Sequence, residues 1–241
     1  MNSGVIGTVL TALAYVVGGI AFWKFSLSRG FKKEHLKWIL AGSLIGGIFG
    51  AKATSLLLSI LHGASPADLL AHPDGRSIIG GILFGWLGVE LAKKKLKITR
   101  STGDGFAFAL SIGEAIGRIG CFFAGCCYGE ICTLPWAVFQ HDAMRHPTQL
   151  YSAALALFVF LFLLFMKNKV KYEGDLFRIY LLFYGVGRFC MEFFRVRSEV
   201  YFGLSVAQWV SIEITAAMTL ALIWTYTHKN PPAEDGANET M

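Results

Sequence analysis

The sequence predicts an all-α integral membrane protein with seven transmembrane helices, its N-terminus outside the cell and its C-terminus in the cytoplasm. Apolar residues make up 54% of the 241 residues and charged residues only 16%. Together with a mean hydropathy of +0.53, this composition excludes an ordinary soluble domain of the same length. Seven apolar stretches approach or reach the length that crosses about 30 Å of hydrocarbon, and basic residues gather in alternate loops between them.

The seven predicted helices follow these stretches in chain order. They cover residues 5–22, 38–61, 77–92, 106–123, 150–166, 176–194 and 204–226. The third and fifth are short for a full span, so we expect little tilt or an extension from their flanks. The first is predicted to be retained, because residues 1–4 lack the basic segment of a cleavable signal peptide. Glycines at small-xxx-small spacing, such as Gly46 with Gly50 and Gly81 with Gly85, predict close packing of helix backbones.

Basic residues set the predicted orientation. They lie between the first and second, third and fourth, and fifth and sixth helices: Lys24, Arg29, Lys32, Lys33, Lys37, Lys93, Lys94, Lys95, Lys97, Arg100, Lys167, Lys169 and Lys171. By the positive-inside rule these loops are cytoplasmic. We therefore expect residues 62–76, 124–149 and 195–203 on the outer face, one transmembrane domain over residues 1–228, and a disordered cytoplasmic tail over residues 229–241. The net charge of +6 then reflects topology, and we predict no nucleic-acid partner.

Two arginines stand within or at the end of apolar stretches, each beside a glutamate at helical spacing. Glu114 precedes Arg118 by four residues and Glu192 follows Arg188 by four, so on helices each pair shares a face and neutralises part of its charge. A charge at membrane depth costs about 2.5–3.5 kcal/mol even on the lenient insertion scale, and such residues usually mark a pathway or a site. The charged positions therefore indicate where function lies.

Further charged residues gather near the same predicted outer face. They are Arg76, Arg195, Arg197 and Glu199. Snorkelling of long side chains to the membrane interface accounts for Arg195 and Arg197 equally well, but it suits Arg188 poorly because that residue lies inside an apolar stretch.

Three segments resemble the signatures of the prolipoprotein diacylglyceryl transferase family. Residues 117–129 read GRIGCFFAGCCYG, where the family pattern is GRxGNFxNxExxG; residues 146–151 read HPTQLY; and residues 184–195 read YGVGRFCMEFFR. Weaker matches cover residues 46–52 and 74–85, so the resemblance runs in the family's order from the second predicted helix onward.

The resemblance implies an activity, its partners and a location. Members of this family move the diacylglyceryl group of phosphatidylglycerol to the sulfur of a lipobox cysteine in a secreted preprotein, and release glycerol phosphate. We therefore expect a multi-pass enzyme of the bacterial inner (plasma) membrane, with its active site on the extracytoplasmic side. Its partners would be phosphatidylglycerol, membrane lipid and a lipobox-containing preprotein or another acceptor, and we expect neither a cofactor nor a metal ion.

The resemblance also carries site residues over to this chain. Arg118 and Arg195 match family arginines that act on the phosphate, and Glu199 matches a nearby acidic position. His72 and His146 lie on the predicted outer side, so we add them as candidate proton acceptors. The pair of Arg188 with Glu192 either orients and gates the site or is structural. The residues expected to bind substrate are Arg76, Gly80, Gly81, Cys121, Cys126, Gln149, Tyr151, Arg188 and Glu192.

The chain departs from the family pattern at the expected chemistry. Cys121 and Ala124 replace the two signature asparagines, Cys126 replaces the glutamate, and Ile79 stands where the family places a histidine. Because isoleucine accepts no proton, another residue takes that role, the acceptor thiol ionises on its own near pKa 8.5, or the reaction differs.

Four of the five cysteines crowd one predicted outer segment, with Cys190 apart from them: Cys121, Cys126, Cys127 and Cys132. Their spacing lacks the two separated pairs of most zinc sites, which argues against a metal. A disulfide between Cys126 or Cys127 and either Cys121 or Cys132 is one alternative, and packing by small polarisable side chains is the other.

Three further functions remain open at this point. One is a paralogue that uses phosphatidylglycerol with a different acceptor. A second is a membrane thiol oxidoreductase, against which stands the absence of any Cys-x-x-Cys pair. The third is a transporter or lipid-binding protein in which the buried ion pairs form a pathway.

Overall fold

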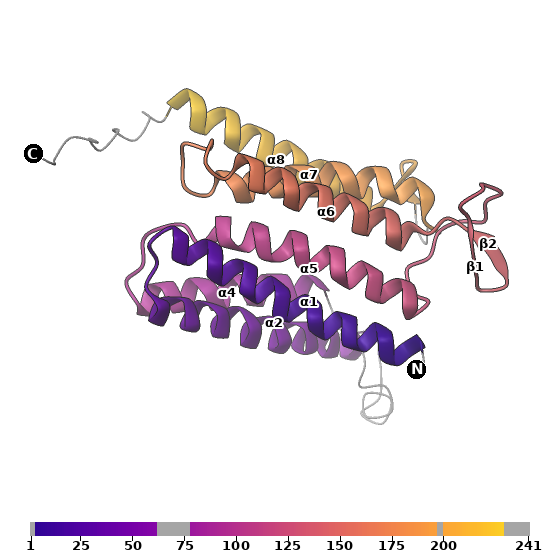
Figure 1. The fold of residues 1–241 in the computed structure, drawn as a ribbon, viewed down its shortest axis with the longest axis horizontal. Helices are drawn as coiled ribbons and strands as arrows, with labels where there is room; N and C mark the ends of the chain where they lie inside the picture. The colour runs from indigo at the N-terminus through magenta and orange to yellow at the C-terminus, as the bar shows by residue number, and fades with distance from the viewer. Residues whose placement is uncertain (1–2, 62–77, 197–199, 229–241) are drawn as a thin grey trace, which may run out of the picture. The chain divides into compact units, whose positions relative to one another are not determined.

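The computed structural model describes residues 3–61, 78–196 and 200–228, which are predominantly helical (Figure 1). The α-helices in this part of the chain are α1 (Ser3–Ser28), α2 (Lys33–Leu61), α4 (Ile78–Lys95), α5 (Gly103–Phe123), α6 (Thr148–Met166), α7 (Asp175–Met191) and α8 (Val206–His228). Each of the seven predicted stretches coincides with one of them. At two predicted ends the chain is not α-helical: residues 192–194 form a 3₁₀ turn after α7, and Leu204 and Ser205 form a short strand before α8. Several other helices extend a few residues past their predicted ends.

Five of the described helices are long and apolar enough to cross a membrane, namely α1, α2, α5, α6 and α8. This finding agrees with the prediction of an all-α membrane protein. The predicted fifth helix, α6, is among the five although its apolar stretch was short. α4 carries Glu90 and three lysines within its 18 residues, and α7 has only 17 residues. The count of seven spans and the orientation of the termini therefore stay predictions.

The chain forms two compact units, residues 26–100 and residues 1–25 with 101–241. In the first unit α2 packs on α4 through glycines, as their spacing predicts. A methyl group built on Gly42 would lie 2.6 Å from the carbonyl oxygen of Gly88, and the Cβ positions of Gly46 and Gly50 would meet the carbonyl oxygens of Phe84 and Gly80. The two backbones therefore approach more closely than any other residue allows.

In the second unit α5 packs on α6, and α7 packs on α8. The buried core consists of Ala107, Phe108, Val159, Leu163, Leu176 and Tyr180. Asp104 in the first turn of α5 accepts hydrogen bonds from the backbone N–H groups of Gly174 (2.9 Å) and Phe177 (3.2 Å), which ties α5 to the start of α7. At the same end, the fully buried Asp175 accepts hydrogen bonds from Arg178 (2.7 Å) and the Tyr226 hydroxyl (2.9 Å).

Two small antiparallel hairpins lie outside the helices. The first, β1 (Val138–Gln140) with β2 (Ala143–Arg145), lies in the connection from α5 to α6 (Figure 1). The second pairs β3 (Val200–Tyr201) with β4 (Leu204–Ser205) before α8. His141 and Asp142 form the two-residue turn of the first hairpin, and both have positive φ (49° and 60°), as a type I′ turn requires. The sequence did not predict these strands.

We predict that Gly88→Ala destabilises the protein, because its Cβ would meet the backbone of Gly42. Overpacking of this kind typically costs about 1–3 kcal/mol, which outweighs the gain of about 1 kcal/mol from replacing glycine within a helix. Gly19→Ala in α1 is the matched control, since nothing lies within 4 Å of its Cβ position. Thermal unfolding in detergent measures the difference, and equal midpoints for the two variants would contradict this packing.

Candidate functional site

Both predicted arginine–glutamate pairs are formed. The Arg118 Nη2 atom lies 3.1 Å from Glu114 Oε1, and its Nε atom donates to the same oxygen at 3.3 Å. The Arg188 Nη1 atom lies 2.8 Å from Glu192 Oε2. The exposed fraction of each arginine side chain is between 21% and 23%, so both charges are partly withdrawn from solvent and each needs its carboxylate.

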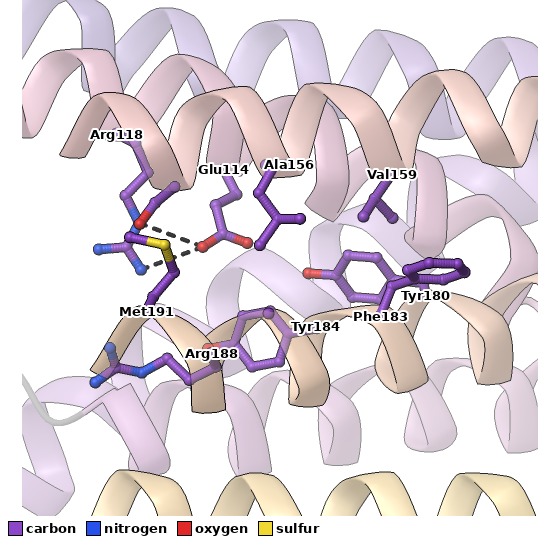
Figure 2. Close-up of a pocket in the computed structure, with 12 residues that line it drawn as sticks. Glu114, Arg118, Ala156, Val159, Tyr180, Phe183, Tyr184, Arg188 and Met191 are labelled. Atoms are coloured by element: carbon purple, nitrogen blue, oxygen red, sulfur yellow. Dashed lines mark hydrogen bonds and ion pairs between the residues drawn. The ribbon is translucent and has the colours of Figure 1, made fainter. Parts of the chain in front are cut away.

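Both arginines line one pocket between α5, α6 and α7. It is partly open to solvent, has a cavity volume of about 30 Å³, and is lined by Glu114, Arg118, Ser152, Leu155, Ala156, Val159, Tyr180, Phe183, Tyr184, Gly187, Arg188 and Met191. Figure 2 shows Arg118 and Arg188 at one end of the pocket, and Val159, Tyr180 and Phe183 at the other. The pocket therefore has the two arginines at one end and aromatic and aliphatic side chains at the other.

A buried hydrogen-bond network holds Glu192 in place. Glu192 Oε1 accepts a hydrogen bond from the Ser205 hydroxyl at 3.1 Å. The backbone N–H of Ser205 donates to Gln208 Oε1 at 2.9 Å, and the backbone N–H of Gln208 donates to the Ser205 hydroxyl at 3.2 Å. All three residues are buried. The start of α8 thus fixes the carboxylate that orients Arg188.

Backbone hydrogen bonds join the three segments that carry the family resemblance. The N–H of Gly129 donates to the carbonyl of His146 (3.1 Å), and the N–H of His146 donates to the carbonyl of Glu130 (3.0 Å). On the other side the N–H of Glu130 donates to the carbonyl of Phe194 (2.9 Å), and Gly129 forms a β-bridge with Arg195. We call this arrangement of residues 129–130, 146 and 194–195 the loop junction. It fixes the backbone of Arg195 beside the end of the signature segment.

Three thiols gather just before the loop junction. Cys121 lies in the last turn of α5, Cys126 and Cys127 follow in the loop, and their sulfur atoms all lie within 4.8 Å of one another. Cys132 lies outside this group and pairs through its backbone N–H with Met144 at 3.0 Å. All five cysteines are free thiols in the structure, so none of the disulfides considered from the sequence is formed.

The start of α6 holds the turn that carries two of these thiols. Gln149 Nε2 donates a hydrogen bond to the carbonyl of Cys126 at 2.8 Å, and the Thr148 hydroxyl donates to the carbonyl of Cys127 at 2.9 Å. Thr148 and Gln149 are buried, and Gln149 Oε1 has no hydrogen-bond partner within the part of the chain that the structure describes. Cys127 has a φ of 60°, a left-handed conformation that residues other than glycine seldom adopt.

The neighbours of Cys127 favour its thiolate. The pKa of the Cys127 thiol is lowered to about 5, first by a hydrogen bond with the Cys121 thiol and then by Arg195, the Cys126 thiol and Arg118, which together outweigh the opposing effect of burial. Burial raises the pKa of the Cys126 thiol. Arg195 also interacts electrostatically with Arg188. Cys127, Arg118 and Arg195 therefore lie within electrostatic range of one another, and Arg188 lies within range of the same two arginines.

His146 and Tyr151 lie at the edge of this site. His146 Nδ1 is 3.4 Å from the Tyr151 hydroxyl, which accepts a hydrogen bond from Trp136 Nε1 at 2.7 Å. The rings of both residues also lie against Phe194, with ring centroids 5.3 Å and 6.2 Å apart. The histidine thus lies in the loop junction with a polar partner.

The other predicted site residues lie outside the described residues or in the unit of residues 26–100. His72, Arg76 and Glu199 lie outside the described residues. Gly80 and Gly81 belong to the unit of residues 26–100, where they pack against Gly50, Thr54, Gly47 and Ala51 of α2. Their observed role is helix packing.

Sequence reasoning missed Tyr180, Tyr184, Ser205 and Gln208. The two tyrosines precede Arg188 by eight and four residues, so the i, i+4 spacing that revealed the ion pair also places them on its face. No sequence spacing indicates Ser205 and Gln208, because they belong to a different element from Glu192 and meet it only in the folded chain.

We predict that Gly129→Ala disrupts the loop junction. Its Cβ would lie 2.6 Å from the His146 carbonyl oxygen and 2.7 Å from that of Phe194, both of which belong to backbone that the junction fixes. Limited proteolysis within residues 124–147 should accelerate, and the thermal midpoint should fall. Gly4→Ala, with nothing within 4 Å, is the control. Cleavage at the wild-type rate would show that the junction tolerates a side chain.

Comparison with known proteins agrees with the resemblance. The family model described as prolipoprotein diacylglyceryl transferase matches residues 4–224. The phosphatidylglycerol–prolipoprotein diacylglyceryl transferase of Clostridium tetani is 32% identical over 214 residues, which cover 84% of this chain and 86% of the relative. The enzyme of that name from Wolbachia pipientis of Culex pipiens is 33% identical over 221 residues, 83% of this chain and 84% of the relative. The chain therefore belongs to the prolipoprotein diacylglyceryl transferase family.

Proposed function

We propose that this protein transfers the diacylglyceryl group of phosphatidylglycerol to a cysteine thiol of a prolipoprotein and releases glycerol phosphate. The observation that carries the proposal is that Arg118 and Arg188 line one pocket with an apolar far end, and that Arg195 lies within electrostatic range of Arg188 and Cys127. Relatives that cover most of the chain carry the name of this activity. A phospholipid presents the matching chemistry, an anionic phosphodiester joined to apolar chains.

In this proposal Arg118 and Arg195 bind the phosphodiester. A guanidinium group offers a planar fork of donors that matches two phosphate oxygens. Glu114 keeps Arg118 extended into the pocket, and the loop junction fixes the backbone of Arg195. In a site partly shielded from water, the same donors stabilise the charge that develops on the departing glycerol phosphate. Glu199 would act beside Arg195, as its family position suggests.

The remaining site residues orient the substrate and the arginines. Arg188 with Glu192 forms a positioning pair anchored by Ser205. Gln149 holds the turn of Cys126 through its carbonyl, and Tyr151 lies beside His146. Substrate binding by Arg76, Gly80 and Gly81 stays a prediction from the sequence. For the proton acceptor we propose His146, with His72 as the second choice, because Ile79 cannot serve.

We further propose seven spans with an outer N-terminus and a cytoplasmic tail over residues 229–241, in a bacterial inner membrane. The candidate site lies at the end of α5, the start of α6 and the end of α7. The basic residues Lys167, Lys169 and Lys171 lie at the opposite ends of α6 and α7. The positive-inside rule places that basic end in the cytoplasm, so the site would face the extracytoplasmic side, where prolipoproteins carry their lipobox.

A different acceptor is the second candidate function. It is favoured by Ile79, Cys121, Ala124 and Cys126, which stand where the family signature has a histidine, two asparagines and a glutamate. These substitutions change groups around the acceptor thiol while the arginines are kept.

We predict that Arg118→Lys and Arg195→Lys each reduce turnover by about 10²-fold or more, because lysine keeps the charge but loses the paired donors. The assay follows labelled phosphatidylglycerol and a lipobox peptide with purified protein in nanodiscs. Arg178→Lys, at the basic end of α7, is the control and should retain activity.

The same assay separates the alternatives. Full activity in both arginine variants would reject the phosphate clamp. Release of glycerol phosphate without peptide labelling would indicate another acceptor, and no lipid turnover with any acceptor would reject the transferase assignment.

A further inference from the structure

The group of Cys121, Cys126 and Cys127 has the dimensions of a metal site. Their sulfur atoms all lie within 4.8 Å of one another. Thiolates bound to one zinc ion lie about 2.3 Å from the metal, and hence about 3.8–4.0 Å from each other. Small side-chain rotations are enough to close that difference. The sequence spacing argued against a metal because it lacks two separated pairs, but the folded turn brings three ligands together.

The backbone around these cysteines is held from several sides. Cys126 donates its backbone N–H to the carbonyl of Cys121 at 3.1 Å. Gln149 and Thr148 fix the carbonyls of Cys126 and Cys127, and Cys127 keeps its left-handed conformation. Residues that orient ligands in this way are typical of metal sites, where the supporting hydrogen bonds set the geometry.

Charge and access also fit a bound dication. Three thiolates around a divalent ion leave a net charge of −1, and the guanidinium groups of Arg118 and Arg195 interact electrostatically with Cys127. Thiolate ligands favour soft or borderline ions such as zinc. Cys126 is exposed while Cys121 and Cys127 are half-buried, so a fourth ligand can approach from the open side.

We propose that Cys121, Cys126 and Cys127 bind one zinc ion through three thiolates, and that the open fourth position receives the thiol of the acceptor. Three protein ligands with one open position are the arrangement of catalytic rather than structural zinc sites. The role of the open position in binding the acceptor thiol rests on the proposed transferase function. It compensates for the lack of a histidine at Ile79, because a thiol bound to the metal gives up its proton more readily to the proposed acceptor, His146.

The chemistry balances without an oxidant or reductant. The acceptor thiol binds the metal and releases its proton to His146, the proposed acceptor, which passes it to solvent. Its sulfur then attacks the carbon of the diacylglyceryl group that is bonded to the phosphate oxygen. A carbon–sulfur bond forms, and the bond between that carbon and the phosphate oxygen breaks. The electron pair stays on the phosphate oxygen, and glycerol phosphate leaves as a dianion beside the arginines.

The first experiment needs neither lipid nor peptide. Tag-free protein is purified in nanodiscs under reducing conditions, and its metal content is measured by mass spectrometry after equilibration with zinc and removal of excess. One zinc per chain is expected. Cys121→Ser, Cys126→Ser and Cys127→Ser should each lower the zinc affinity at least about 10-fold, whereas Cys132→Ser and Cys190→Ser should not change it.

Cobalt provides an independent readout of the ligands. Cobalt(II) bound in place of zinc should show a thiolate-to-metal charge-transfer band that is lost in the three serine variants. Cys126→His keeps a ligand and should keep the metal, which separates lost coordination from misfolding. Zinc content no higher than in the triple serine variant, with the three thiols free or joined in a disulfide, would overturn the site.

The fourth position is tested with the cobalt protein and two peptides. A lipobox peptide with cysteine should intensify the charge-transfer band, and the same peptide with serine should not. An unchanged band, or transferase activity that survives complete removal of zinc, would overturn the acceptor half. Bound zinc in a protein that turns over no lipid would leave the metal site standing and reject the transferase function instead.

Discussion

Burial of guanidinium groups beside an apolar helix bundle is the constraint on which the candidate site depends. Arg118 and Arg188 keep their charge there because Glu114 and Glu192 lie within 3.1 Å and 2.8 Å of them. Without a carboxylate, a partly buried charge is strongly destabilising. Glu192, which pairs with Arg188, is itself held in place by a hydrogen bond from the Ser205 hydroxyl. The position of Arg188 therefore depends on residues outside α7.

Outside the helices, the loop junction holds the segments of the candidate site together. Gly129 and Glu130 lie between His146 and Phe194, and the backbone groups of all four are hydrogen bonded. The absence of a side chain at Gly129 is what permits this approach. As a result, the three cysteines at the end of α5, the polar start of α6 and Arg195 after α7 share one region, although nothing in the membrane-spanning helices requires it.

The helices were predictable because a membrane imposes length and composition on every span. The predicted boundaries are less accurate at polar ends: α2 begins at Lys33, five residues before its apolar stretch, because helical hydrogen bonding continues past the apolar residues. The hairpins were not predictable, since strands of two or three residues are too short to show alternation. Their turns require positive φ at His141, Asp142, Phe202 and Gly203, and Phe202 is of a residue type that seldom adopts it.

The sequence by itself determined the helical class, the two ion pairs and the family, because composition, four-residue spacing and short motifs are all local in the chain. Only the tertiary structure decided that the cysteines form a group of three and that the tyrosines of α7 share a pocket with Arg118. The hydrogen bonds that place Cys126 and Cys127 come from residues 23 and 21 positions away. Contacts across such a separation are set by helix packing and loop closure, so no local pattern records them.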